Sequence, residues 1–303
     1  MSDAFDLDAV TAIDMHVHCE VSHTGEPALP TALQDGARRF FGDTNGPLPS
    51  LDETADHYRE RNLAAVIFTI DIEATLGHTG VSNDEIAEGA ARHPDVCIPF
   101  ASIAPTRGAA GIAEARRLVT DHGVCGFKFH PNLQAFFPND RSAYPLYEAI
   151  SALGVPALFH SGQSGIGAGL RGGGGIRLKY SNPLHLDDVA ADFPDLQIIV
   201  AHPSFPWQDE ALAVAVHKPN VWLDLSGWSP KYFPPQLVRF ANTLLRDRVL
   251  FGSDHPFITP DRWLRDFETI DIRDDVRPAI LKDNAVRLLG LDRRTTGADD
   301  RRG

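Results

Sequence analysis

Two histidines lie two residues apart in the segment Asp14-Met15-His16-Val17-His18. Residues at this spacing on an extended strand project to the same side, so both imidazoles can reach one ligand. Neutral imidazole is a common ligand of zinc and related divalent metals. The pair alone is a weak signal, because chance or a core histidine gives the same pattern.

Further polar residues end short apolar runs later in the chain. A cluster of imidazoles around a carboxylate is unfavourable in a core without a partner, and a divalent metal supplies that partner. We therefore expect a metal site if the ends of these runs meet. The residues are Lys128 and His130 in GFKFHP, His160 in FHSG, His202 in AHPS and Asp254 in GSDHP.

A repeated order of apolar run, loop and helical segment would bring these side chains together. The runs are short and nearly continuous, as in strands buried on both faces. Alternating strands and helices indicate a parallel sheet, and eight repeats favour a closed (β/α)8 TIM barrel over an open doubly wound sheet. The runs are Val10–Val17, Ala64–Ile70, Val96–Ile103, Val124–Phe129, Val155–Phe159, Leu196–Ala201, Val221–Leu225 and Val249–Phe251.

Local signals mark the helices between the runs. Ser82 to Glu85 resembles a capping box, and Gly123 can end the helix that precedes it. The segment Asp275–Leu289 has an apolar side and predicts a final helix.

Two long insertions interrupt the repeat. Glu20–Ser50 is rich in proline and glycine, and Ser161–Pro183 contains four consecutive glycines. Both follow the carboxyl ends of strands, where barrels build their sites, so they are candidate lids. We expect one barrel domain over residues 1–290, with lids at about 20–50 and 161–183, and a flexible tail over 291–303.

These motifs resemble the amidohydrolase superfamily over about residues 10–290. GFKFHP, FHSG, AHPS and GSDHP are most similar to amidohydrolase-related family 2, the relatives of aminocarboxymuconate-semialdehyde decarboxylase. That branch contains both hydrolases and decarboxylases. The resemblance therefore implies the fold and a metal site, and leaves the substrate open.

The resemblance implies a role for each matching residue. His16, His18, His160 and Asp254 match the metal ligands, and Asp254 can also take a proton from metal-bound water. His202 matches a histidine that orients or deprotonates water in single-metal relatives and is a ligand in two-metal relatives. One divalent metal is expected; zinc suits the ligands best, and manganese or iron is compatible.

Lys128 has three interpretations. In the first, Lys128 is carboxylated and bridges two metals. In the second, its ammonium group holds a substrate carboxylate or an oxyanion. In the third, it pairs with Asp254 or another acidic group. His130 and Arg177 are candidate substrate contacts, with a structural histidine and a solvated loop cation as the alternatives. Trp207 and Trp228 follow strands closely and are candidates for the wall of an apolar pocket.

The leading hypothesis is a metal-dependent hydrolase. Metal-activated water would attack an activated carbonyl (amide, lactone, ester, thioester or β-dicarbonyl) of a small anionic or aromatic substrate. The alternative is a metal-dependent non-oxidative decarboxylase of an aromatic or unsaturated acid. A non-catalytic binding barrel is a remote alternative, because it predicts broken ligand positions and all of them are filled.

Composition excludes several classes of protein. The chain has 303 residues, and 41 acidic against 28 basic side chains give a net charge of −13, which argues against nucleic-acid and anionic-membrane binding. No apolar stretch reaches the ~18 residues of a membrane helix, and no secretory signal is recognisable. Three cysteines form no disulfide framework, so we expect a cytoplasmic protein. The expected partner is a small-molecule substrate, and a homodimer or homotetramer is the base-rate expectation.

Overall fold

The computed structural model describes residues 5–42 and 46–292. Eight strands appear where the eight apolar runs predict them, and every residue of each strand is buried. Each strand is shorter than the run that predicts it. The strands are β1 (Ala12–His18), β2 (Leu63–Phe68), β3 (Cys97–Pro99), β4 (Phe127–Phe129), β5 (Ala157–His160), β6 (Ile198–Ala201), β7 (Val221–Asp224) and β8 (Val249–Leu250).

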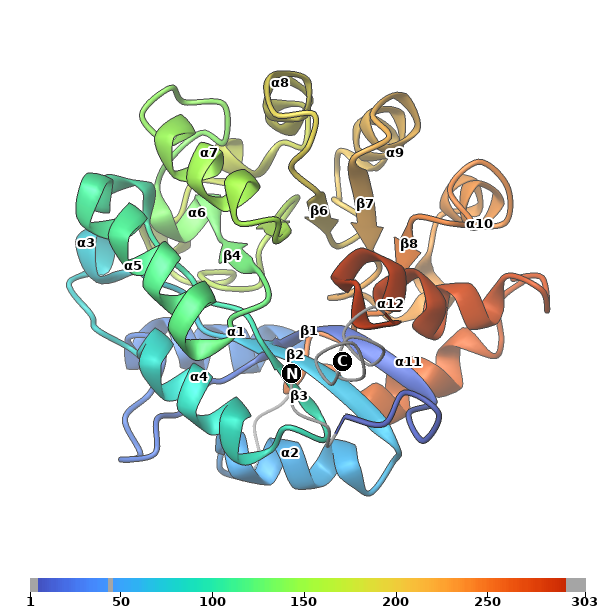
Figure 1. Ribbon diagram of the computed structural model, residues 1–303, viewed down its shortest axis with the longest axis horizontal. Coiled ribbons are helices and arrows are strands. Elements are labelled where there is room, and N and C mark those ends of the chain that lie inside the picture. The colour runs from blue at the N-terminus through green and yellow to red at the C-terminus, as the bar shows by residue number, and fades with distance from the viewer. Residues whose placement is uncertain (1–4, 43–45, 293–303) are drawn as a thin grey trace, which may run out of the picture.

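The strands form two parallel sheets, in the orders β1-β2-β3 and β4-β5-β6-β7-β8. Isolated parallel bridges, Val17 with His255 and Ala101 with Phe127, join the sheets at both seams. The eight strands therefore follow the order of a TIM barrel, with helices around the outside (Figure 1). The predicted (β/α)8 barrel is confirmed.

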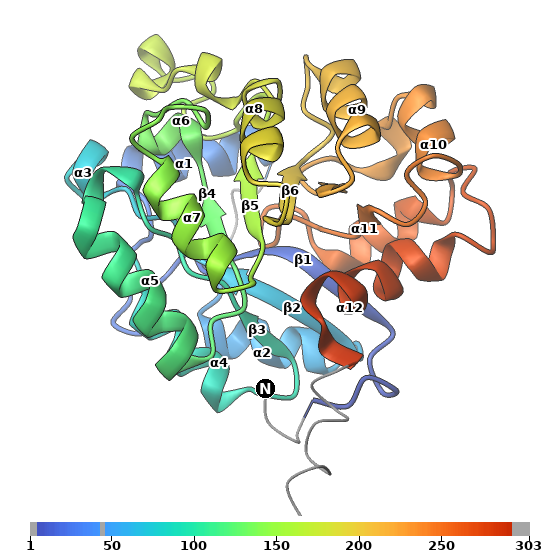
Figure 2. The same ribbon diagram turned by 45° about the horizontal axis from the view of Figure 1, so that its top comes forward.

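The helices vary in length, and the longest follows β3. Helices α7 to α10 stand side by side around one side of the barrel (Figure 2). None of the helices in the described residues is long and apolar enough to cross a membrane. They are α1 (Thr31–Phe41), α2 (Leu51–Arg59), α3 (Glu73–Leu76), α4 (Asn83–Arg92), α5 (Gly108–His122), α6 (Pro131–Gln134), α7 (Tyr144–Ala152), α8 (His185–Asp192), α9 (Gln208–His217), α10 (Pro235–Ala241), α11 (Pro260–Phe267) and α12 (Asn284–Leu289).

The helix signals hold in part. Gly123 ends α5 in the left-handed conformation, and Ser82 caps α4 by accepting the backbone N–H of Glu85. The Glu85 carboxylate instead accepts from the backbone of His23, so that capping box is only half formed. The predicted final helix is divided, because a π-helical segment, Ala279–Asp283, precedes α12.

The core has an inner and an outer layer. Side chains alternate along each strand: in β2, Val66 and Phe68 pack inside the barrel with Ile13 of β1, while Ala65 and Ile67 pack outward against the helices. The side chains at the carboxyl ends of the inner rows therefore meet at one mouth.

The two insertions pack against each other at that mouth. The first contains α1, and the second contains the 3-10 helices η2 (Arg171–Gly175) and η3 (Leu178–Ser181). A Cβ on Gly165 would lie 2.5 Å from the Phe41 ring, so glycine permits this close approach. The predicted tail begins with the buried Leu291, and its residues 293–303 lie outside the described residues.

Candidate metal centre

A β-bulge aims the paired histidines into the barrel. The register of β1 against β2 shifts between Asp14 and Val17. Met15 packs inside before the shift and Val17 packs outward after it, so the bulge sets the facing of the residues beyond it. His16 and His18 consequently share one side, with their Nε2 atoms 3.2 Å apart.

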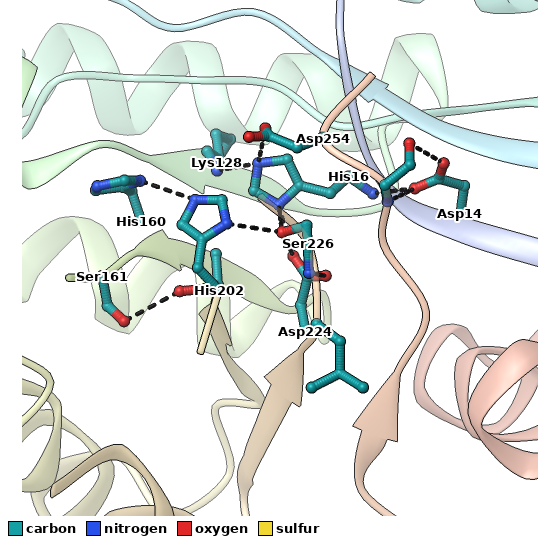
Figure 3. A network of polar contacts seen from close by, with 12 residues as sticks. Asp14, His16, Lys128, His160, Ser161, His202, Asp224, Ser226 and Asp254 are labelled. Atoms are coloured by element: carbon teal, nitrogen blue, oxygen red, sulfur yellow. Dashed lines mark hydrogen bonds and ion pairs between the residues drawn. The ribbon is translucent and has the colours of Figure 1, made fainter. Parts of the chain in front are cut away.

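The Asp254 carboxylate, in the loop after β8, lies beside His16 (Figure 3) and also contacts His18. Asp254 Oδ1 lies 3.4 Å from His16 Nε2 and 3.3 Å from His18 Nε2. Lys128 of β4 reaches the same point, with its Nζ 3.0 Å from His16 Nε2. The ligand atoms of His16, His202 and Asp254 all lie within 4.8 Å of one another, and the three residues are buried.

His160 stands beside this group. Its Nδ1 lies 3.0 Å from His202 Nε2, and its ring stacks on His130 with centroids 3.9 Å apart and an interplanar angle of 8°. His160 Nε2 and His130 Nδ1 are buried without a hydrogen-bond partner among the described residues. Because buried polar atoms are normally satisfied, the unpaired nitrogens indicate room for a ligand.

A carboxylate at the end of β7 fixes the imidazole tautomers. Asp224 Oδ2 lies 2.5 Å from His16 Nδ1 and accepts the Ser226 hydroxyl proton at 2.8 Å. Ser226 Oγ therefore accepts from His202 Nδ1, which is 2.9 Å away. Burial raises the pKa of Asp224 to about 8, while the Ser226 hydrogen bonds and the charge of Lys128 favour its ionised form. With Asp224 ionised, both imidazoles are protonated at Nδ1 and their Nε2 lone pairs face the centre, as metal ligands require.

Asp224 and Ser226 are functional residues that the histidine motifs do not indicate. Asp224 ends an apolar strand just as His160 ends β5, but VWLD contains no histidine and predicts only a strand. Asp14 was likewise quoted without a role; it accepts hydrogen bonds from the Tyr58 hydroxyl (2.6 Å) and the Ser253 backbone (2.9 Å), which tie β1 to β8.

Strained backbone turns two of the site residues toward the centre. His202 (φ 70°) and Asp254 (φ 75°) adopt the left-handed conformation, which costs non-glycine residues roughly 1–3 kcal/mol each. Two glycines leave space for side chains of the site. A Cβ on Gly227 would lie 2.5 Å from His202 Nδ1, and a Cβ on Gly252 would lie 2.0 Å from Asp224 Oδ1. Such outliers concentrate at functional sites.

Burial sets the charges of the cluster. It lowers the pKa of His16 and His160 below the usual range and that of His202 to about 4, so these imidazoles are neutral at neutral pH. It also lowers the Lys128 pKa to about 7. Burial alone would raise the pKa of Asp254, but the hydrogen bond from His18 and the electrostatic interactions with His202, His18 and Lys128 hold it below its usual value.

The donor set fits a divalent metal. It combines neutral imidazole nitrogens with an ionised carboxylate, which is the chemistry of a three-nitrogen, one-oxygen site. His16, His18 and Asp254 come together as the sequence predicts. His202 is predicted to carry protons, but its ligand atom lies as close to those of His16 and Asp254 as a metal ligand would. His160 is predicted to be a ligand, but it contacts His202 rather than His16 or Asp254.

A cavity of about 330 Å³ opens onto this centre. His18, His160, His202 and Asp254 form its polar side. Of the predicted substrate contacts, His130 and Trp228 line it, whereas exposed Arg177 and half-buried Trp207 are not among its lining residues, nor is the fully buried Lys128. Glu20 and Arg262 line it without having been predicted. The aromatic walls are Phe40, Phe41, Trp228, Tyr232 and Phe257.

A curated relative matches only part of the chain. Protein fluG from Emericella nidulans is 32% identical over 97 residues, which are 29% of this chain and 11% of that protein. The chain thus spans only a small part of fluG.

Solved structures match nearly the whole chain. An uncharacterized TIM-barrel protein from Bordetella bronchiseptica has a TM-score of 0.72 at 26% identity, over 92% of this chain and 98% of its own. A dihydroxybenzoic acid decarboxylase from Polaromonas sp. JS666, solved with manganese and the inhibitor 2-nitroresorcinol, has a TM-score of 0.64 at 20% identity, over 93% and 98%. The Amidohydrolase family model matches residues 13–291, and the chain belongs to this family of enzymes.

Proposed function

We propose that the protein is a metal-dependent, non-oxidative decarboxylase of aromatic carboxylic acids. The observation that carries the proposal is the aromatic-walled cavity that opens onto the buried His16–His202–Asp254 group. The likeness to a manganese-containing dihydroxybenzoic acid decarboxylase supports this reaction over the hydrolysis expected first from the sequence.

The cavity suits a small planar ligand. Its volume of about 330 Å³ is at the low end for ligand sites. Phe41 stacks on Phe257 with ring centroids 5.1 Å apart and an angle of 16°, which gives one wall a flat edge. Trp228, whose ring centroid lies 5.8 Å from that of Phe205, contributes another aromatic surface. A benzene ring bearing a carboxylate fits walls of this kind.

The residues of the centre have two roles, to hold a metal and to orient the ligands that hold it. His16, His18 and Asp254, with His160 or His202, would hold one divalent transition metal; the nitrogen-rich set suits zinc, and manganese is the metal of the structural relative. A bound metal would chelate the substrate carboxylate and a neighbouring oxygen. Asp224 and Ser226 orient His16 and His202 through their Nδ1 atoms.

The reaction requires proton delivery. The bond between the ring carbon and the carboxylate carbon breaks, carbon dioxide leaves, and the electron pair stays on the ring carbon, which takes a proton. The proton comes from solvent or from a substrate hydroxyl group. Asp254 and His202 both line the cavity, and we assign them to accept this proton and pass it to the ring carbon. The aromatic walls exclude water from the same carbon.

Hydrolysis is the second candidate. The observation in its favour is the neutral His202, whose Nδ1 is fixed by Ser226 and whose Nε2 can accept a proton from water. Hydrolysis is also the reaction that a carboxylated Lys128 and a second metal would support. The Lys128 Nζ contact with His16 Nε2 accounts for the side chain without that modification.

Product analysis separates the two reactions. The protein loaded with manganese or zinc is incubated with hydroxybenzoic acids in deuterated water and, separately, with lactones and esters in oxygen-18 water. Decarboxylation predicts carbon dioxide and one deuterium on the ring of the product. Oxygen-18 in a product carboxylate, without carbon dioxide, would support hydrolysis and refute the proposal.

A further inference from the structure

One cation stands in the wall of the cavity. Among the described residues, Arg262 is the only arginine or lysine that lines it. Arg262 belongs to α11 and is half-buried. Lys128 and Arg177, the cations that the sequence predicts as anion contacts, are not among the lining residues. Arg262 is therefore the permanent positive charge nearest to a bound substrate.

The backbone of Arg262 is held while its guanidinium is available. Its backbone N–H donates to the capping hydroxyl of Thr259 at 3.3 Å. Within the described part of the chain, the guanidinium has no hydrogen bond or ion pair. Asp266, one turn further along α11, instead accepts from Ser229 at 2.6 Å, which attaches the helix to the loop after β7.

The acidic groups that line the cavity contact the histidines of the metal centre. Asp254 contacts His16 and His18. Glu20 lies 3.6 Å from His18 Nδ1 and 3.4 Å from Gln34 Nε2. Neither carboxylate pairs with Arg262, and Asp266 lies within electrostatic range of it without forming an ion pair. The guanidinium can therefore still pair with a charge brought by the ligand.

We propose that the substrate carries a second acidic group and that Arg262 binds it. Guanidinium forms two parallel hydrogen bonds with a carboxylate, a geometry that lysine does not offer. The substrate class is then an aromatic diacid, with one acidic group at the metal centre and the other on the α11 wall. This inference rests on the proposed function only for the placement of the first group.

Ligand binding tests the inference without turnover. Dissociation constants of benzoate and of the three benzenedicarboxylates are measured calorimetrically on the manganese-loaded protein. The variants are Arg262→Gln, Arg262→Lys and the matched control Arg265→Gln. Arg265 lies on the same helix with its side chain 71% exposed, and its Nε is 3.6 Å from Asp266. Thermal unfolding verifies that each variant is folded.

The inference predicts a selective loss. At least one dicarboxylate should bind wild type more tightly than benzoate, and Arg262→Gln should weaken it about tenfold or more while changing benzoate binding less than twofold. Arg262→Lys should be intermediate, and Arg265→Gln should match wild type. Equal losses for both ligand classes, no loss, or no preference for any dicarboxylate in wild type would overturn the inference.

The proposed function can fail separately. Binding is measured as heat and not as turnover, so a protein that passes this binding test but releases no carbon dioxide from any acid refutes decarboxylation alone. A protein that decarboxylates monoacids and shows no Arg262-dependent binding refutes the diacid assignment alone.

Discussion

Asp224 offers a sharp test of how the metal centre is held, because both of its oxygens act only as acceptors. With the carboxylate ionised, Oδ2 accepts hydrogen bonds from His16 Nδ1 (2.5 Å) and Ser226 Oγ (2.8 Å), and Oδ1 accepts one from the Ser226 backbone N–H (3.0 Å). Asp224→Asn keeps the shape but provides one acceptor and one donor. In either orientation of the amide, a buried donor faces another donor.

The expected cost follows from that mismatch. Leaving one buried donor unsatisfied costs about 1–3 kcal/mol of the free energy of unfolding. Loss of the partner that orients a ligating histidine lowers metal affinity by about 10–100-fold, which corresponds to about 1.4–2.7 kcal/mol. Metal affinity is measured by competition with a chromophoric chelator, and stability by urea unfolding of the metal-free protein.

A matched variant separates the two effects. Asp266→Asn also replaces a buried carboxylate that accepts a hydroxyl proton at 2.6 Å, but Asp266 lies outside the cluster. It should lose stability and keep wild-type metal affinity. If Asp224→Asn binds metal within twofold of wild type, the orienting role assigned to Asp224 is wrong.

Three other substitutions probe the surroundings. Gly252→Ala places a Cβ 2.0 Å from Asp224 Oδ1, so it should lower the free energy of unfolding by about 1–3 kcal/mol; an unchanged urea midpoint would contradict this packing. Phe41→Ala removes the stack on Phe257 and part of the cavity wall, so KM should rise more than kcat falls, and the reverse pattern would count against a binding wall. His202→Ala should reduce turnover far more than metal content, measured by elemental analysis, if His202 carries protons; a parallel loss of metal would assign it as a ligand.

The barrel could be predicted because its signals are local and repeated. Each strand is a short buried run, and strand–helix alternation leaves few topologies. The divided final helix was not predictable in the same way. The apolar spacing from Asp275 to Leu289 fits a continuous helix, whereas the structure inserts a π-helical segment at Ala279–Asp283. A π-helical segment differs from an α-helix in its backbone hydrogen bonding, and it has no distinct sequence signature.

The candidate site was predictable where residue type alone indicates the chemistry. His16, His18 and Asp254 carry that signal, and the structure brings them together. Cation placement was not predictable, because it depends on the side from which a loop or helix approaches the mouth. Arg177 follows β5 in a glycine-rich insertion yet is exposed, whereas Arg262 on α11 lines the cavity.

The central claim is that a metal held by this cluster supports decarboxylation, and a metal titration of carbon dioxide release tests it most directly. Metal-free protein receives increasing manganese or zinc with carboxyl-labelled hydroxybenzoic acids, with and without a second carboxylate, while labelled carbon dioxide is recorded. We predict release that rises to a plateau near one metal per chain and is absent in His16→Ala and Asp254→Ala. Release that is independent of metal, or that survives both substitutions, would contradict the account.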